Sequence, residues 1–194
     1  GTSSNLLGRL ETTIEYTNKT FKNSKIDAEV ELVYLGQTSY TETCSDSDTN
    51  NDNLSTDLTY FRNKNDGVMD EVHQLRDLVH ADVCVLICKT LEGLTYSVAG
   101  IATPSASSES AFMIVGRNFI GNDVTFAHEL GHLVGCKHAH AYEYESGNLK
   151  FQTLMSETGN AYEIPYWSNH LAYYQGVALA AHQINSASVW ASKY

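Results

Sequence analysis

The chain has 194 residues and a formal net charge of −11, with only 12 Lys and Arg. This length suffices for one domain with a hydrophobic core, and apolar runs such as Val83 to Ile87 are too short to span a bilayer. Because nucleic acids and anionic membranes bind basic surfaces, this charge excludes both as expected partners.

Three elements are predicted before residue 58. Apolar residues recur at helical spacing over residues 4–21 and predict an amphipathic helix. From Ile26 to Tyr34 apolar residues alternate with others, which predicts a strand with one buried face. Residues 41–57 are rich in Asp, Asn, Ser and Thr and indicate a polar loop.

Periodicity and turn residues divide the rest of the chain into further elements. Asn122 or Asp123 can cap the helix that precedes Gly135, and the chain from there to residue 175 reads as mostly irregular. The predicted elements are a helix at 67–80, strands at 82–88, 97–102 and 111–115, a helix from 122 or 123 to about 134, and a closing helix at 176–191.

This order of elements predicts an α+β (mixed α/β) fold, in which a twisted mixed β-sheet is backed by helices. We expect one domain, with a larger upper subdomain at 1–135 and a smaller lower subdomain at 136–194.

The chain contains four cysteines, an even number that is compatible with two disulfides in an oxidising compartment. Cys84 and Cys88 cannot pair with each other, because they lie about 13 Å apart on one strand and a disulfide needs Cα atoms within about 7 Å. Any bridges therefore join different elements, and buried free thiols are the equal alternative for Cys44, Cys84, Cys88 and Cys136.

Residues 128–138 read His-Glu-Leu-Gly-His-Leu-Val-Gly-Cys-Lys-His. On a helix, His128 and His132 share a face and can bind one ion. Gly135 can take a positive φ and turn the chain, so that His138 returns to the metal as a third ligand. Three imidazoles leave one position of a tetrahedral zinc ion open for water, which is typical of a catalytic site.

Glu129 lies beside the first of these ligands and need not bind the ion itself. Zinc lowers the pKa of its bound water toward about 7, and a nearby carboxylate can take the proton as general base. The sequence therefore predicts hydrolysis of a carbonyl compound, with Glu129 passing the proton to the leaving amine.

The same residues fit other interpretations less well. Chance is disfavoured because three His, one Glu and one Gly fall at fixed offsets within eleven residues. A structural zinc site with Cys136 as fourth ligand is disfavoured by the direction of Cys136 along the turn, and His140 in place of His138 is disfavoured by the spacing. A calcium loop is the weakest signal, because Asn51 stands where an EF-hand needs Gly and the loop reads better as solvated. Its candidate ligands are Asp46, Asp48, Asn50, Asp52 and Asp57.

The pattern of three His, Glu129 and Gly135 resembles the signature of the metzincin metallopeptidases. The segment Phe151-Gln-Thr-Leu-Met155-Ser is similar to the methionine-containing turn of that clan. Together with Ala111 to Ile120, it resembles the secreted microbial peptidyl-Asp metalloendopeptidase group and the reprolysin type. Met155 also reads as ordinary core filler when taken alone.

The resemblance implies further features. The smaller C-terminal subdomain would carry the Met-turn and a C-terminal helix, with Met155 beneath the histidines. An edge strand with Gly100, Ile101 and Ala102 would pair with an extended peptide substrate. Tyr162 and Tyr166 would wall the substrate pocket, although core packing is an equal reading of each. A secreted monomer is expected, of which this chain is the mature form without signal and pro-segment.

The chain also departs from the pattern. Ala139 follows the third histidine where reprolysin-like enzymes place Asp, and Glu157 stands where astacin- and serralysin-like enzymes place a zinc-binding Tyr. The resemblance implies a strand before the first helix, yet the chain begins almost at that helix, so we expect the strand to be absent, cut away or missing from this sequence. The pocket residues that would carry an Asp preference are not identifiable.

These observations predict a zinc-dependent endopeptidase with one catalytic Zn²⁺, which acts on proteins or peptides through a zinc-bound water activated by Glu129. The competing prediction is a catalytically inactive metzincin relative that binds peptides. The presence of Glu129 favours activity, because a base is what an inactive relative most readily loses.

Overall fold

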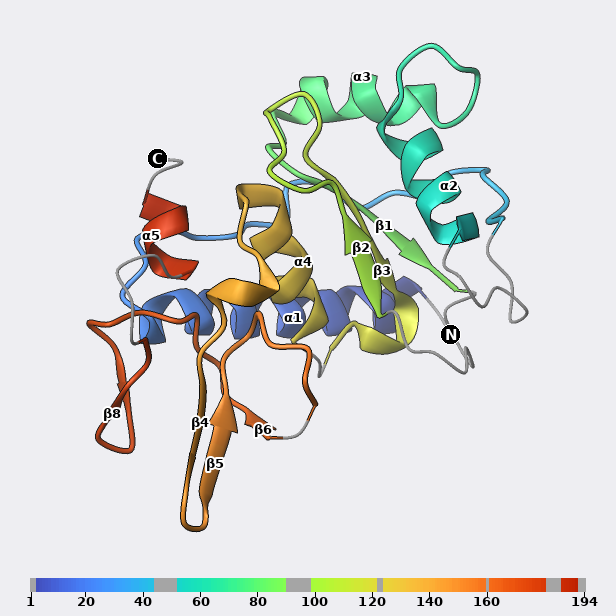
Figure 1. Cartoon of the computed structure of the whole chain (residues 1–194). Coiled ribbons are helices and arrows are strands. Elements are labelled where there is room, and N and C mark those ends of the chain that lie inside the picture. The colour runs from blue at the N-terminus through green and yellow to red at the C-terminus, as the bar shows by residue number, and fades with distance from the viewer. Residues whose placement is uncertain are drawn as a thin grey trace.

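The computed structural model describes residues 3–43, 52–89, 99–121, 124–159, 161–180 and 186–191, and the architecture is given for these residues (Figure 1). The helices are α1 Ser3–Asn23, α2 Asp52–Arg62, α3 Asp70–Val79, α4 Thr125–Val134 and α5 Ser186–Ala191, with 3-10 turns η1 Arg117–Phe119 and η2 His138–His140. The strands are β1 Cys84–Cys88, β2 Gly100–Ala102, β3 Phe112–Gly116, β4 Glu143–Ser146, β5 Leu149–Gln152, β6 Tyr162–Glu163, β7 Tyr173–Tyr174 and β8 Val177–Ala178.

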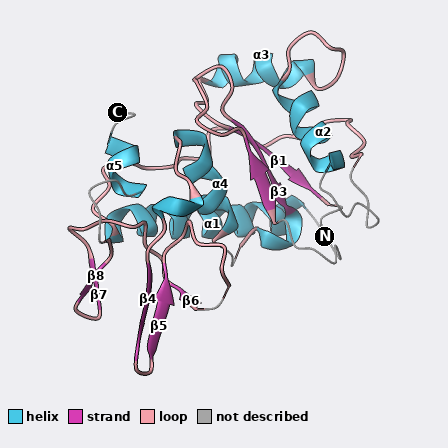
Figure 2. Cartoon of the chain, in the orientation of Figure 1, coloured by secondary structure: helices cyan, strands magenta, loops and turns pink. Residues whose placement is uncertain are grey.

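The upper part of the chain contains a three-stranded sheet in the order β1-β3-β2. β1 runs parallel to β3, and β2 runs antiparallel to it, so the predicted mixed sheet is confirmed. Every residue of β3 is buried, because helices cover both faces (Figure 2). Met113 and Val115 pack with α1 and α4, whereas Phe112 and Ile114 pack with α2 and α3.

The predicted first helix is confirmed as α1, which lies beneath α4 in Figure 1. Its buried face carries three threonines besides Leu10 and Phe21. The Thr13 hydroxyl accepts a hydrogen bond from the Gly121 N–H at 2.8 Å, and the Thr20 hydroxyl accepts one from Trp167 Nε1 at 2.9 Å. α1 therefore connects residues that lie more than 100 positions away in the sequence.

The predicted strand at 26–34 is wrong, because residues 24–43 belong to no sheet. Ile26 and Val30 nevertheless contact the core, as the alternation indicates. The side-chain amide of Asn18 pairs with both the N–H and the C=O of Val30 and takes the place of a neighbouring strand there. Farther along, the side chain of Tyr34 is 49% exposed. The apolar residues that alternate beyond Val30 are therefore not on the buried face that the pattern predicted.

The predicted polar loop at 41–57 is partly wrong, because its last residues begin α2. Leu54, Leu58 and Phe61 are buried at helical spacing, and Ser55, Thr56 and Thr59 between them face outward, whereas Asp57 is buried. The helix predicted at 67–80 is confirmed, with shorter bounds, as α3. Residues 97 and 98 of the predicted strand at 97–102, and the proposed caps Asn122 and Asp123, lie outside the described residues.

The lower part contains strands where the sequence reads as irregular. β4 and β5 form a hairpin closed by Gly147 with φ of 57°, and β6 adds parallel to β5. Within the described residues, the closing helix predicted at 176–191 is wrong over 176–180, where β8 lies, and is confirmed over Ser186–Ala191 as α5. Gln175 and Gly176 both have positive φ, which gives the two-residue turn that closes the β7–β8 hairpin. Residues 181–185 are outside the described part.

None of the described helices combines the length and the apolar character that crossing a membrane would require.

Candidate metal centre

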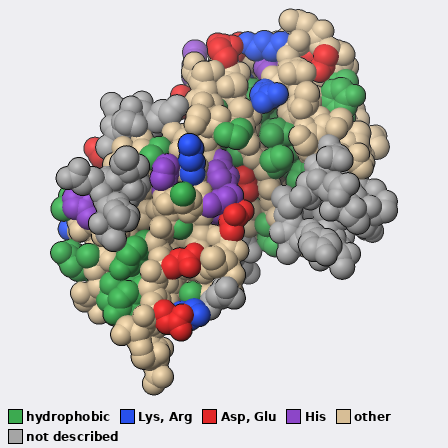
Figure 3. All heavy atoms as spheres, in the orientation of Figure 1, with side chains coloured by type: hydrophobic (Ala, Val, Ile, Leu, Met, Phe, Trp, Pro, Cys, Tyr) green, Lys and Arg blue, Asp and Glu red, His purple; other side chains and the backbone are tan. Residues whose placement is uncertain are grey.

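Helix α4 sets the direction of the first two histidines, and the turn after it brings back the third. Gly135 takes a φ of 102°, and its N–H donates to the carbonyls of Gly131 and His132, which ends the helix. Three residues later, His138 opens η2. In Figure 3 histidine side chains gather at the centre of the visible face.

The three rings present their Nε2 atoms to one point. Nε2 of His138 lies 3.1 Å from Nε2 of His128 and 3.0 Å from Nε2 of His132. Nitrogen ligands about 2.0–2.1 Å from a tetrahedral zinc ion lie roughly 3.3 Å from one another. Among the described residues, these three histidines are the group of His, Cys, Asp and Glu side chains placed to hold a metal ion. Their geometry fits zinc.

The other nitrogen of each ring meets an acceptor. Nδ1 of His128 lies 2.7 Å from the Leu154 carbonyl, and Nδ1 of His132 lies 3.0 Å from the Cys136 carbonyl. Nδ1 of His138 lies 2.8 Å from a carboxylate oxygen of Glu157. Because a neutral imidazole has one N–H, each acceptor places that proton on Nδ1 and leaves the Nε2 lone pair for the metal. Burial also lowers the pKa of His132, which favours the neutral ligand.

Glu129 follows the first histidine on α4 and is only 7% exposed. Burial, and then the negative charge of Glu157, raise the pKa of Glu129 to about 8. A Cβ atom on Gly100 would lie 2.8 Å from Cγ of Glu129, so strand β2 touches the side chain of this acid. The absence of a side chain at position 100 leaves room for Glu129.

The raised pKa of Glu129 predicts a pH-dependent stability of the metal-free protein. An unfolded Glu titrates near 4.5, so the folded state holds an extra proton between pH 4.5 and about 8. Stability is therefore lost as the pH rises through this window. We expect metal-free Glu129→Gln to exceed metal-free wild type in free energy of unfolding by about 2–4 kcal/mol above pH 8, and by little at pH 4.5.

Urea unfolding in a chelator, at several pH values, measures this difference. The exposed helix residue Glu15 supplies the control, because Glu15→Gln should show no such trend. A difference between Glu129→Gln and wild type that stays constant from pH 4.5 to 8 would contradict the prediction.

Met155 packs against helix α4 at Gly131. It is fully buried, and its sulfur would lie 2.7 Å from a Cβ atom on Gly131. Two ring carbons of Trp167 would lie 2.6 and 2.9 Å from the same atom. Gly131 lies between the two helical histidines and has no side chain. Met155 and Trp167 can therefore pack directly on the backbone of α4.

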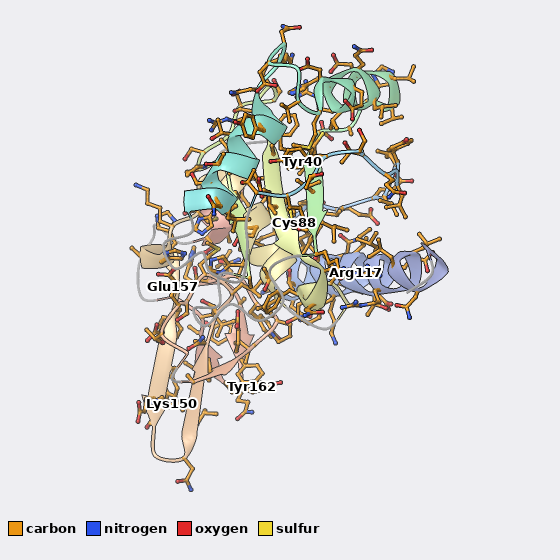
Figure 4. The ribbon with its side chains drawn as sticks, turned by 90° about the vertical axis from the view of Figure 1, so that its right-hand side faces the viewer. Tyr40, Cys88, Arg117, Lys150, Glu157 and Tyr162 are labelled. Atoms are coloured by element: carbon orange, nitrogen blue, oxygen red, sulfur yellow. The ribbon has the colours of Figure 1, made fainter. Side chains whose placement is uncertain are left out.

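The residues predicted to contact substrate lie in different surroundings. Gly100, Ile101 and Ala102 form β2, whose strand partner in the described sheet is β3. Tyr162 on β6 is 69% exposed and lies in the lower part of the molecule (Figure 4). Tyr166 packs with the lower hydrophobic cluster, its ring 5.8 Å from that of Tyr174, as the core-packing reading predicts.

The alternative ligands point elsewhere. Nδ1 of His140 accepts a hydrogen bond from the Lys137 N–H at 2.9 Å, away from the three converging rings. The Cys136 thiol is buried and donates toward the Ser186 carbonyl, and burial raises the pKa of this thiol to about 12. Cys84 and Cys136 are buried thiols, Cys44 lies outside the described residues, and no disulfide joins cysteines within the described part.

The structure describes only some of the candidate calcium ligands. Asp46, Asp48 and Asn50 lie outside the described residues. The fully buried carboxylate of Asp57 accepts hydrogen bonds from the Tyr40 hydroxyl and from the backbone N–H and hydroxyl of Thr43. This carboxylate holds Tyr40 and Thr43 to α2.

The sequence did not predict that Glu157 and Trp167 would contact the site. The sequence marks Glu157 only as a departure from a tyrosine, and nothing in the local pattern indicates its contact with His138. Trp167 belongs to no predicted site, yet it is fully buried and lies against α4. A signal for Trp167 is present in Gly131, since a glycine inside a helix often marks a close approach.

Comparison with known proteins places the chain in a family. The model of metallo-peptidase family M12 matches residues 3–168, which confirms the resemblance drawn from the motif. A peptidyl-Asp metalloendopeptidase of Stenotrophomonas maltophilia (strain R551-3) is 31% identical over 192 residues, and one of Xanthomonas campestris pv. campestris is 29% identical over 189. Each alignment covers 90% of this chain but only 43% and 42% of the relative, so the chain spans less than half of their length.

A solved chain described as "Structure of a chaperone-substrate complex" has a similar fold, with a TM-score of 0.65 and 20% identity, covering 94% of this chain and 29% of that one. The matched family model spans α1 to Ser168 and includes all three converging histidines. The chain belongs to metallo-peptidase family M12.

Proposed function

We propose that this chain is a single catalytic domain that hydrolyses peptide bonds within proteins, with zinc as its metal. The observation that carries the proposal is the convergence of three Nε2 atoms beside a buried carboxyl group on the same helix. His128, His132 and His138 would hold the ion. Membership of the metallo-peptidase family and the printed names of the relatives support this chemistry.

Glu129 is proposed as the general base. When bound, zinc supplies a Lewis acid that polarises the scissile carbonyl and makes water more acidic. Glu129 takes a proton from the attacking water and passes it to the leaving amine. The carboxylate form of Glu129 takes the proton and the protonated form returns it, so one side chain can serve both steps.

The peptide is proposed to bind along β2. The strand has one neighbour in the described sheet, and its other edge can pair with an extended chain through main-chain hydrogen bonds. Gly100 contributes by leaving room for Glu129 beside this edge. The exposed ring of Tyr162 and the half-buried Tyr166 are proposed to line the pocket below, and Met155 to support the histidines.

Gly100→Ala should lower kcat/KM by about 10- to 100-fold with zinc still bound, because a small displacement of a catalytic group is costly. The new Cβ atom would lie 2.8 Å from both Cγ of Glu129 and the Ile114 carbonyl oxygen of β3. Peptide kinetics with metal analysis measures the effect. Gly8→Ala is the control, because a Cβ atom there meets nothing within 4 Å. Full activity of Gly100→Ala would contradict the proposed contact.

We further propose that the protein acts outside the cell and as a monomer. Both proposals rest on the resemblance to secreted enzymes, and the net charge of −11 favours separate, soluble molecules. Detection of the protein in culture medium and its mass by light scattering test them. A disulfide that involves Cys44 stays a prediction, which non-reducing peptide mapping checks.

Metal analysis and casein hydrolysis test the function. The purified protein should contain about one zinc per chain and cleave casein. Removing the ion with a chelator should abolish cleavage, and added zinc should restore it. A protein that binds peptides with zinc present, yet never cleaves them, would be the inactive relative instead. The relatives are named for Asp, and a mixed peptide library shows whether this chain shares that preference.

A further inference from the structure

We propose that Glu157 is a positioning residue whose carboxylate holds His138 in the orientation and tautomer that zinc binding needs. This inference rests on the proposed zinc site. Oε2 of Glu157 lies 2.8 Å from Nδ1 of His138. When the ring donates its Nδ1 proton to this carboxylate, the lone pair is on Nε2, which lies 3.1 and 3.0 Å from the other two Nε2 atoms.

His138 depends on such an anchor more than the other two ligands do. His128 and His132 lie on α4, and backbone carbonyls accept their Nδ1 protons. His138 lies outside that helix on the short turn η2, and its side chain is 40% exposed. A side chain so placed can adopt other rotamers, so a fixed acceptor determines how much of the time its ring faces the metal.

The residues on both sides of Glu157 are themselves held in place. The Ser156 hydroxyl donates to Glu143 on β4 at 2.6 Å. The Thr158 hydroxyl donates to the same carboxylate at 3.2 Å and lies 3.1 Å from the Gln152 amide oxygen on β5. Figure 4 shows Glu157 between the upper sheet and the β4–β5 hairpin. These contacts with the β4-β5-β6 sheet therefore hold the segment that places the Glu157 carboxylate beside His138.

The charge of Glu157 distinguishes it from the other two acceptors, which are neutral carbonyls. A carboxylate makes a metal-bound imidazole a stronger ligand. The Glu157 side chain is 64% exposed, and at exposed positions even a full ion pair adds little to folding stability. Loss of this carboxylate should therefore weaken metal binding and leave the metal-free fold nearly unchanged.

Zinc affinity, measured by competition with a chromophoric chelator, tests the inference without an activity assay. Glu157→Ala should weaken zinc binding by about 10- to 100-fold, and Glu157→Gln by less, because an amide oxygen still accepts the hydrogen bond. Glu145→Ala is the matched control: Glu145 is 66% exposed and pairs with Lys150 at 2.8 Å, as Glu157 pairs with His138. The control should bind zinc like wild type.

Two further measurements separate positioning from folding. The visible spectrum of the cobalt-substituted protein should change in Glu157→Ala and not in Glu145→Ala, and metal-free melting temperatures of all variants should agree within about 2 °C. Zinc binding by Glu157→Ala within about twofold of the control would overturn the inference. So would a large loss of metal-free stability. A wild type that binds no zinc would instead overturn the proposed function.

Discussion

Glu129→Gln should lower kcat by about 10²- to 10⁴-fold while zinc stays bound. The amide matches the carboxylate in size, so it fits the same buried position beside Gly100, but it cannot take a proton from water. The three histidines keep their acceptors, since none of these is Glu129. Activity and metal content should therefore separate in this variant. Peptide kinetics and zinc analysis on the same sample measure both.

Glu15→Gln provides the control for this experiment. Glu15 is an exposed residue of α1, so the same chemical change there should leave both kcat and zinc content unchanged. Glu129→Gln with wild-type kcat would rule out the assigned base. A variant that loses its zinc together with its activity would show that Glu129 is needed to hold the metal.

Trp167→Ala should destabilise the fold by about 3–5 kcal/mol, the usual cost of removing a large buried aromatic side chain. The Trp167 ring stacks on Phe21 of α1 with centroids 5.8 Å apart and packs edge-on against Trp190 of α5 at 5.4 Å. It also lies against Gly131 of α4, and its Nε1 donates to Thr20. One side chain therefore joins three helices, and its removal leaves a cavity at their junction.

Urea unfolding of the metal-free protein measures this loss without a contribution from zinc binding. Tyr173→Ala is the control, because that aromatic ring is 60% exposed and its loss should change the free energy of unfolding by no more than about 0.5 kcal/mol. Equal losses in the two variants would show that the junction around Trp167 is not a principal source of stability.

Local patterns predicted the elements that have one dominant buried face. The first helix and the strand at 82–88 are found as α1 and β1, because periodicity reports which side of a segment is buried. The same reasoning failed at 26–34, since alternation indicates an extended backbone but not a neighbouring strand. At 176–191 it missed the turn at Gln175 and Gly176, whose positive φ values make a hairpin instead of a helix.

The sequence by itself predicted the proposed metal ligands and the proposed base. The spacing of His128 and His132, and the turn that Gly135 permits, depend on backbone geometry within eleven consecutive residues. Only the tertiary structure decided what surrounds them: the acceptors Leu154 and Glu157, and the contact of Gly100 with Glu129. These partners lie 19 to 29 positions away in the chain, so the packing of separate segments brings them together, and burial in that packing raises the pKa of Glu129.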